Sequence, residues 1–177
     1  MAKKDIKAKK GFTIIEVVLV LAIAGLIFLM VFVALPALQR SQRDTQRRED
    51  MARFMTQLEN YKSNNSGKIP NLNQGAWDTF KNDYLLTDDD DFIDPDGTRY
   101  TFGGGCELSS SSTCSSTRFS SPVEPGAGMS WEQNKHKIYV YTKARCDGEK
   151  AVYAGDSPYL VAIRFKLEGG GIYCGNV

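Results

Sequence analysis

The chain has 177 residues, enough for one globular domain with one long additional element but too few for two full domains. With 42% hydrophobic residues and a formal net charge of +1, it has neither the composition of a disordered chain nor the bulk positive charge of a nucleic-acid-binding protein. The charge is unevenly distributed, because residues 1–10 contain five lysines and one acidic residue. A basic segment before an apolar run is typical of a targeting sequence.

Residues 12–38 form this apolar run, which only Thr13 and Glu16 interrupt with polar side chains. Its length exceeds the roughly 20 residues that a helix needs to cross a bilayer core. The lysines on its N-terminal side predict that residues 1–10 lie in the cytoplasm and the remainder outside. The run is too long for a cleaved secretory signal and has no small-x-small site at its far end, so hydropathy alone predicts an ordinary signal anchor.

Glu16 is the residue that hydropathy does not explain. A lone carboxylate costs about 2.5–3.5 kcal/mol or more at the centre of a bilayer. No Lys or Arg lies between Gly11 and Gln39 to pair with it. Cleavage after Gly11 would create a free ammonium group on Phe12, and this cation could pair with Glu16 of the same or a neighbouring copy.

The sequence KKGFTIIE at residues 9–16 resembles the class III signal of type IV prepilins and pseudopilins. The resemblance is strong over residues 9–36 and general in layout over the rest of the chain. It implies that a prepilin peptidase cuts between Gly11 and Phe12 and methylates the new N-terminal Phe12. It also implies that Glu16 neutralises a neighbour's N-terminus during assembly.

Two helix-weakening residues, Gly25 and Pro36, fall inside the apolar run. Proline removes a backbone donor and clashes with the preceding turn, so we expect a kink or break near residues 32–36. The resemblance implies that the segment between such a glycine and proline can unwind in an assembled filament. The alternative is a simple kink, which membrane helices tolerate.

Residues 39–66 predict an amphipathic continuation of the same helix, because apolar residues recur at helical spacing from Met51 to Tyr61. Arginines alternate with acids along it, which favours a solvated or inter-subunit face over nucleic-acid binding. These arginines are Arg40, Arg43, Arg47, Arg48 and Arg53. We expect Gly67 to end the helix in a left-handed cap. Such a helix would be about 75 Å long, more than its own head could cover, which argues for contact with lipid or other copies.

Residues 67–177 predict a small head. A loop-rich connection with a short helix near residues 77–86 and a strand near 99–102 precedes a β-rich tail. The tail predicts an antiparallel meander of three or four strands, which are expected at residues 137–143, 150–154, 159–167 and 172–174. The resulting fold class is α+β, a long N-terminal helix packed on a small antiparallel sheet as in a type IV pilin. The glycine runs at 103–105 and 169–171 are expected to form turns.

All four cysteines lie in the C-terminal half and lack zinc-site spacing. An even number of cysteines beyond a membrane segment favours disulfides in an oxidising compartment. Three pairings are possible, of which we favour Cys106–Cys114, closing a Ser-rich loop, together with Cys146–Cys174, tying the C-terminus to the sheet. The second would resemble the C-terminal disulfide loop of many pilins.

The remaining candidate chemistry is weak. Aspartates cluster at residues 88–96, but their spacing is not that of an EF-hand. A solvated acidic loop is therefore the preferred interpretation, with Asp91, Asp94 and Asp96 as minor Ca²⁺ candidates because some pseudopilins bind calcium in their heads. His136 has no nucleophile context in the sequence, and neither glycine run belongs to a phosphate-binding loop. We expect no enzymatic activity and no cofactor.

These features predict a type IV pilus subunit that is made as a prepilin, cleaved after Gly11 and assembled through its N-terminal helix into a surface filament for adhesion, motility or DNA uptake. The expected domains are a cytoplasmic leader (1–11), a transmembrane and polymerisation helix (12–38), its amphipathic continuation (39–66) and an extracytoplasmic head (67–177). Before processing the chain would cross the cytoplasmic membrane once, and afterwards it would lie in an extracellular pilus on a bacterial cell.

The expected partners are other copies in a helical filament, the prepilin peptidase and the pilus assembly machinery, with no direct nucleic-acid binding. One alternative is a minor pilin, or a pseudopilin of type II secretion or competence. Another, from a different class, is a non-polymerising signal-anchored binding protein, which leaves Glu16 unexplained.

Overall fold

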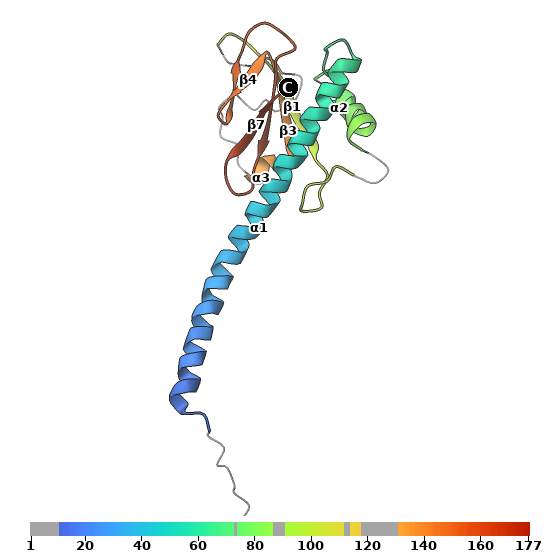
Figure 1. Cartoon of the computed structure of the whole chain (residues 1–177). Coiled ribbons are helices and arrows are strands. Elements are labelled where there is room, and N and C mark those ends of the chain that lie inside the picture. Colours follow the sequence, from blue (N-terminus) through green and yellow to red (C-terminus); the bar gives the residue numbers. More distant parts are fainter. Residues whose placement is uncertain (1–10, 73, 87–90, 112–113, 118–130) are drawn as a thin grey trace, which may run out of the picture. The chain divides into compact units, whose positions relative to one another are not determined.

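The computed structural model describes residues 11–72, 74–86, 91–111, 114–117 and 131–177 (Figure 1). The chain divides into two units, Met1–Gln39 and Arg40–Val177. The helices are α1 (Ile14–Asn64), α2 (Gln74–Phe80), the π-helical η1 (Lys81–Leu85) and α3 (Trp131–Asn134). The strands are β1 (Thr101–Leu108), β2 (Cys114–Thr117), β3 (Lys137–Thr142), β4 (Ala144–Asp147), β5 (Lys150–Tyr153), β6 (Val161–Lys166) and β7 (Ile172–Asn176).

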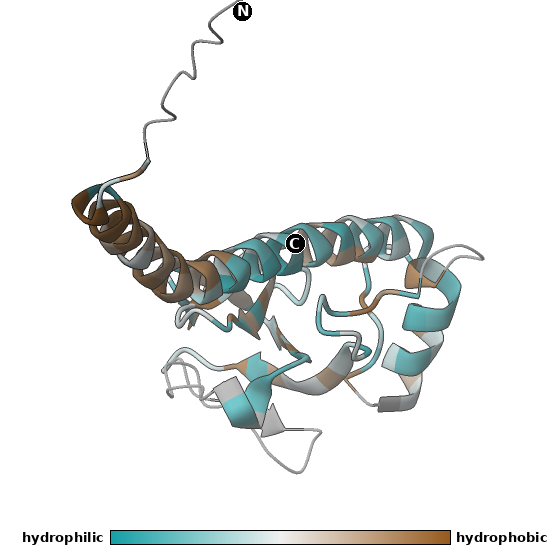
Figure 2. Cartoon of the chain, turned by 90° about the horizontal axis from the view of Figure 1, so that it is seen from below, coloured by the Kyte–Doolittle hydropathy of each residue, from teal (hydrophilic) through white to brown (hydrophobic). Residues whose placement is uncertain are grey.

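In the first unit, α1 is apolar and its large side chains from Phe12 to Leu38 are exposed. Figure 2 shows this stretch in brown, followed by the hydrophilic part of the helix in teal. It is the one described helix that is long and apolar enough to cross a membrane. The helix continues through Gly25 and Pro36, so the chain has no break there, and a kink at Pro36 and unwinding in a filament stay predictions. Proline removes a single backbone donor, and the hydrogen bonds of the adjacent turns hold the helix together.

The second unit contains a five-stranded sheet in the order β2-β1-β3-β6-β7 and a separate β4–β5 hairpin. A long helix with a small sheet confirms the predicted α+β layout. The tail strands pair antiparallel as predicted, β3 with β6 and β6 with β7, but the strand predicted at residues 150–154 pairs with β4 in the separate hairpin. The sheet as a whole is mixed rather than antiparallel, because β1 lies parallel to β3. Turn residues between strands predict hairpins, which join antiparallel strands. A parallel pair requires a crossover connection instead, and turn residues do not predict one.

Gly103, Gly104 and Gly105 lie inside β1, so the turn predicted there is wrong. A side chain at Gly105 would approach the Leu72 side chain to 2.6 Å, and one at Gly103 would approach the Tyr139 ring to 2.7 Å. The glycines therefore allow neighbouring side chains to approach the strand closely. The second glycine run, at residues 169–171, does form the turn between β6 and β7.

The core lies on both faces of this sheet. Met51, Phe54 and Leu58 of α1 are buried in a cluster with aromatic residues of α2 and with the inward-facing residues of β3 and β6. Tyr139 and Tyr141 point to the opposite face, where the β4–β5 hairpin covers them. The apolar stripe predicted from helical spacing thus packs against the sheet.

Helix α1 ends as the sequence predicts. Ser66 and Gly67 both have positive φ, and the Gly67 amide donates to the Lys62 carbonyl at 2.7 Å. This left-handed termination satisfies a carbonyl of the last helical turn.

Candidate functional site

The start of α1 carries the first candidate site, a capping box formed by Thr13 and Glu16. The Thr13 amide and hydroxyl donate to Glu16 Oε2 at 3.0 and 2.9 Å, and the Glu16 amide donates to the Thr13 hydroxyl at 3.3 Å. The pair reciprocally satisfies backbone donors that the first turn of a helix leaves open. The T-x-x-E spacing at residues 13–16 is the sequence signature of this capping box, and it provides Glu16 with a partner that is not a cation.

The capping box leaves part of the Glu16 carboxylate available. Within the described chain, all hydrogen bonds to this side chain involve Oε2, and Oε1 accepts none. The Phe12 side chain is 89% exposed, and no atom of the described residues would contact a side chain added at Gly11. The bond between these two residues and a carboxylate oxygen four residues further on are thus open to other molecules.

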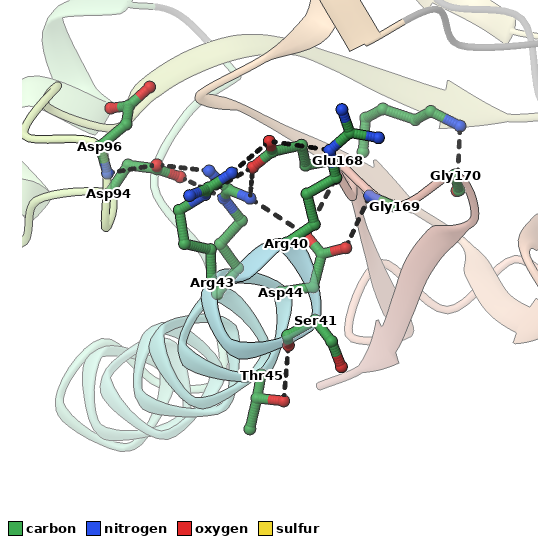
Figure 3. Close-up of polar contacts among 12 residues, drawn as sticks. Arg40, Ser41, Arg43, Asp44, Thr45, Asp94, Asp96, Glu168, Gly169 and Gly170 are labelled. Atoms are coloured by element: carbon green, nitrogen blue, oxygen red, sulfur yellow. Dashed lines mark hydrogen bonds and ion pairs between the residues drawn. The ribbon is translucent and has the colours of Figure 1, made fainter. Parts of the chain in front are cut away.

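The second candidate site is an ionic cluster in the head, and Figure 3 shows its members Arg43, Asp44, Asp94 and Glu168. The fully buried side chain of Arg47 lies at its centre. Its Nε and Nη2 donate to the two oxygens of Asp94 at 2.6 and 2.8 Å. Its Nη1 donates to Asp44 and to Glu168, both at 3.0 Å. Arg43 adds a second bidentate pair with Glu168, at 2.8 and 2.6 Å. Paired, hydrogen-bonded charges of this kind are the form in which ions are tolerated in a protein interior.

The cluster has strong electrostatic effects. The hydrogen bond from Arg43 is the main cause that lowers the pKa of Glu168 to about 2, and the bond from Arg47 adds to it. Burial alone would lower the pKa of Arg47, but its bonds to Asp94 and Glu168 outweigh burial and raise it. Asp44 also accepts the amides of Glu168 and Gly169, at 2.9 and 2.7 Å. The cluster thus fastens α1 to the β6–β7 turn and to the segment that contains Asp94.

This arrangement corrects the prediction for the arginine stripe. Arg40 and Arg48 are exposed, as a solvated or inter-subunit face requires, but Arg47 is buried and Arg43 is partly covered. The partners of Arg47 include Asp94 and Glu168, which are 47 and 121 residues away in sequence. Local charge alternation carries no information on such distant pairs.

The aspartate prediction is also changed. Ligand atoms of Asp94, Asp96 and His136 lie within 4.8 Å of one another, whereas Asp91 pairs with Arg99 at 3.4 Å. The Asp96 Oδ2 lies 3.1 Å from His136 Nε2, and both Asp94 oxygens accept from Arg47. The guanidinium repels any cation placed beside Asp94, which disfavours the minor Ca²⁺ interpretation. The burial of Asp94 also departs from the preferred solvated loop, of which residues 88–90 lie outside the described residues.

The cysteines stabilise the β-rich part of the head. A disulfide joins Cys146 of β4 to Cys174 of β7, the pairing that we favoured, and connects the hairpin to the edge of the sheet. Cys106 is also disulfide-bonded. The side chain of Cys114, its predicted partner, lies outside the described residues, so that pairing stays a prediction.

The N-terminal segment has a recognisable sequence. Residues 6–32 match the prokaryotic N-terminal methylation motif, a span that includes Gly11, Phe12 and Glu16. No curated protein and no solved structure matches the chain significantly. The matched motif therefore covers the first candidate site and does not extend to the head.

Proposed function

We propose that this chain, which its N-terminal methylation motif assigns to the type IV pilin and pseudopilin family, is a structural subunit of a type IV pilus. It is made as a prepilin with a cytoplasmic leader (1–11) and anchored in the cytoplasmic membrane by residues 12–38. A prepilin peptidase cuts between Gly11 and Phe12 and methylates the Phe12 nitrogen. The assembly machinery then packs the helices of many copies into an extracellular filament that carries the heads.

The exposed apolar part of α1 is the observation that carries this proposal. Its large side chains from Phe12 to Leu38 have no cover within the described chain. A continuous apolar surface of this size is stable only against lipid or against other protein. The membrane provides the first environment before assembly, and neighbouring copies provide the second in the filament.

Glu16 gives the packing its register in this proposal. Its Oε2 is engaged by Thr13, which leaves Oε1 for the ammonium that cleavage creates on Phe12 of a neighbouring copy. The attraction is strong because lipid and apolar side chains exclude water and lower the local dielectric constant. Each subunit would then contribute one cation and one carboxylate to the contact between copies.

Substitutions at Glu16 separate its capping role from its charge. Glu16→Gln retains a side chain that can complete the capping box but removes the negative charge, whereas Glu16→Ala removes both. We expect both variants to be cleaved at Gly11 and both to be incorporated into filaments much less than the wild-type chain. Immunoblots of sheared filaments and of membrane fractions measure incorporation and cleavage in the same cells.

Normal filaments from Glu16→Gln would contradict the charge-pairing proposal and leave capping as the role of Glu16. A normal level of filaments from Glu16→Ala would contradict both roles. The abundance of the wild-type chain in purified filaments separately tests whether it is the major subunit, because a minor pilin or pseudopilin would be a small fraction of the protein.

A further inference from the structure

The head contains an open cleft of about 340 Å³ that has no part in the N-terminal processing or in the ionic cluster. The segment that follows α1, residues 68–72, lines the cleft together with Pro158 and Tyr159. Glu107, Thr142 and Lys143, at the ends of β1 and β3, also line it. The volume falls in the range of small-molecule sites.

Two glycines, which have no side chain, allow the segments that line the cleft to pack closely against their neighbours. Gly67 has φ +80°, and an added Cβ would lie 3.0 Å from the Tyr159 ring, so this glycine provides the place where the ring rests. Lys62 donates to the Tyr159 carbonyl at 3.2 Å and holds the same loop. Gly105 accommodates Leu72 in the same way, since an added Cβ would approach its side chain to 2.6 Å. The cleft is therefore formed before any ligand enters.

Several polar groups around the cleft remain available. Lys143 is neutralised by Glu107 at 2.9 Å and by Asp156 at 3.6 Å. In contrast, the side chains of Lys68, Asn71 and Tyr159 make no hydrogen bond or ion pair within the described part of the chain, and all three are exposed. The cleft thus offers one unmatched cation, one amide and one aromatic ring with a hydroxyl group.

We propose that this cleft binds an acidic saccharide, with a sugar ring packed on Tyr159 and the sugar carboxylate paired with Lys68. The apolar C–H face of a sugar ring gains dispersion contacts on an aromatic side chain. Sugar hydroxyls match the amide of Asn71, which both donates and accepts. A purely apolar ligand would leave these polar groups unpaired, and a highly charged ligand would find only one unmatched cation.

Calorimetric titration of the full-length chain in micelles of a non-glycosidic detergent tests this proposal. The acidic probe is the hyaluronan disaccharide, which contains glucuronate and N-acetylglucosamine, and the neutral probe is chitobiose. We expect the acidic probe to bind about tenfold more tightly, because a charge-assisted hydrogen bond to Lys68 is added. Lys68→Gln should abolish this preference, and Lys150→Gln, an exposed lysine that does not line the cleft, should preserve it.

Tyr159 provides a second test of the same contact. Tyr159→Ala should abolish the binding of both probes, whereas Tyr159→Phe, which retains the ring, should bind them within about threefold of the wild-type chain. Near-ultraviolet circular dichroism verifies that each variant is folded, and the exposed Lys68→Gln variant tests the site should Tyr159→Ala unfold.

Three results would overturn the proposal. They are the absence of binding by either saccharide, an unchanged acidic preference in Lys68→Gln, and equally tight binding of a tetraglutamate peptide that depends on Lys68 in the same way. The last result would identify an acidic peptide as the occupant. No lining residue belongs to residues 6–32, so failure of this proposal would leave cleavage after Gly11 unaffected.

Discussion

The two parts of helix α1 differ in whether their side chains are exposed or are buried by the rest of the chain. Up to Leu38 the large apolar side chains are exposed, whereas beyond Arg40 the helix buries Arg47, Met51 and Phe54 within the head. The backbone hydrogen bonds are internal to the helix in both parts. The difference therefore lies in the side chains, because the first part requires lipid or other copies and the second finds its partners within the same chain.

Charged residues follow the same division. In the first part a single carboxylate, Glu16, is held by Thr13 three residues away. In the second part Arg47 is held by Asp94 and Glu168, which come from distant segments. A local cap leaves Glu16 able to bind another molecule, whereas the buried cluster has satisfied its cations within the head. The substitutions below should separate head stability from processing at Gly11.

The largest effect on the head is expected from Arg47→Met, which leaves several carboxylates without their buried cation. Removal of one partner from a buried ionic cluster costs about 3–5 kcal/mol. Urea titration of the full-length chain in micelles, followed by near-ultraviolet circular dichroism, measures this loss. Arg48→Met, at the exposed neighbouring position, is the matched control and should change the free energy of unfolding by less than about 0.5 kcal/mol.

Cleavage at Gly11 should remain normal in Arg47→Met whenever the chain reaches the membrane. A loss below about 1 kcal/mol would mean that the cluster is not what holds α1 to the head.

The next effect concerns the Cys146–Cys174 disulfide, which joins residues separated by 28 positions. Replacement of both cysteines by serine should lower the free energy of unfolding by about 3.5 kcal/mol, because the cross-link restricts the unfolded chain. The same urea titration measures it. Equal stability of the wild-type and double-serine chains would show that the contacts of the hairpin suffice without the bond.

Acid should weaken the ionic cluster through Glu168. The pKa of its carboxyl group is about 2 in the folded head, against an ordinary value of 4.5, chiefly because Arg43 donates to it. A lowered folded pKa stabilises the protein above the ordinary value, and this contribution disappears as the pH falls from about 4.5 to 2. We expect it to reach about 2 kcal/mol after allowance for solvent screening.

Glu168→Gln should therefore be less stable than the wild-type chain at pH 6, and this difference should shrink by about 1.5 kcal/mol by pH 2.5. Urea titrations at a series of pH values measure this dependence. Parallel pH profiles for the two chains would contradict the role assigned to the Arg43–Glu168 pair.

The smallest effect is expected from Glu16→Gln on the head. The residue makes its described contacts only with Thr13, so the free energy of unfolding of the head should change by less than about 0.5 kcal/mol. A larger change would mean that the two parts of α1 are energetically coupled. The same variant is expected to be incorporated into filaments much less than the wild-type chain. It should therefore impair the function of the first part of α1 while the stability of the head stays unchanged.

Local patterns explain which features could be predicted from the sequence. The apolar run, the left-handed termination of α1 at Gly67 and the strands of the tail depend on composition, spacing and turn residues, and these act over a few positions. The methylation motif is equally local. The Cys146–Cys174 pair was favoured among three possible pairings, and the structure contains it.

The errors came from contacts between distant residues. The parallel pairing of β1 with β3 and the burial of Arg47 depend on segments that only the folded head brings together. The glycine run that contains Gly105 predicts a turn, because the packing of Gly105 against Leu72 cannot be read from its sequence neighbours. The capping box is a different case, since the T-x-x-E spacing is local and can be read from the sequence.

The mass of the N-terminal peptide of the mature chain, isolated from the cells that make it, tests the proposed function most directly. Processing of a type IV filament subunit predicts a peptide that begins at Phe12 and carries one methyl group on its nitrogen. A Gly11→Ala chain should retain residues 1–11, with impaired cleavage. A wild-type chain that still begins with its lysine-rich leader, or one cut beyond Leu38, would contradict the proposal.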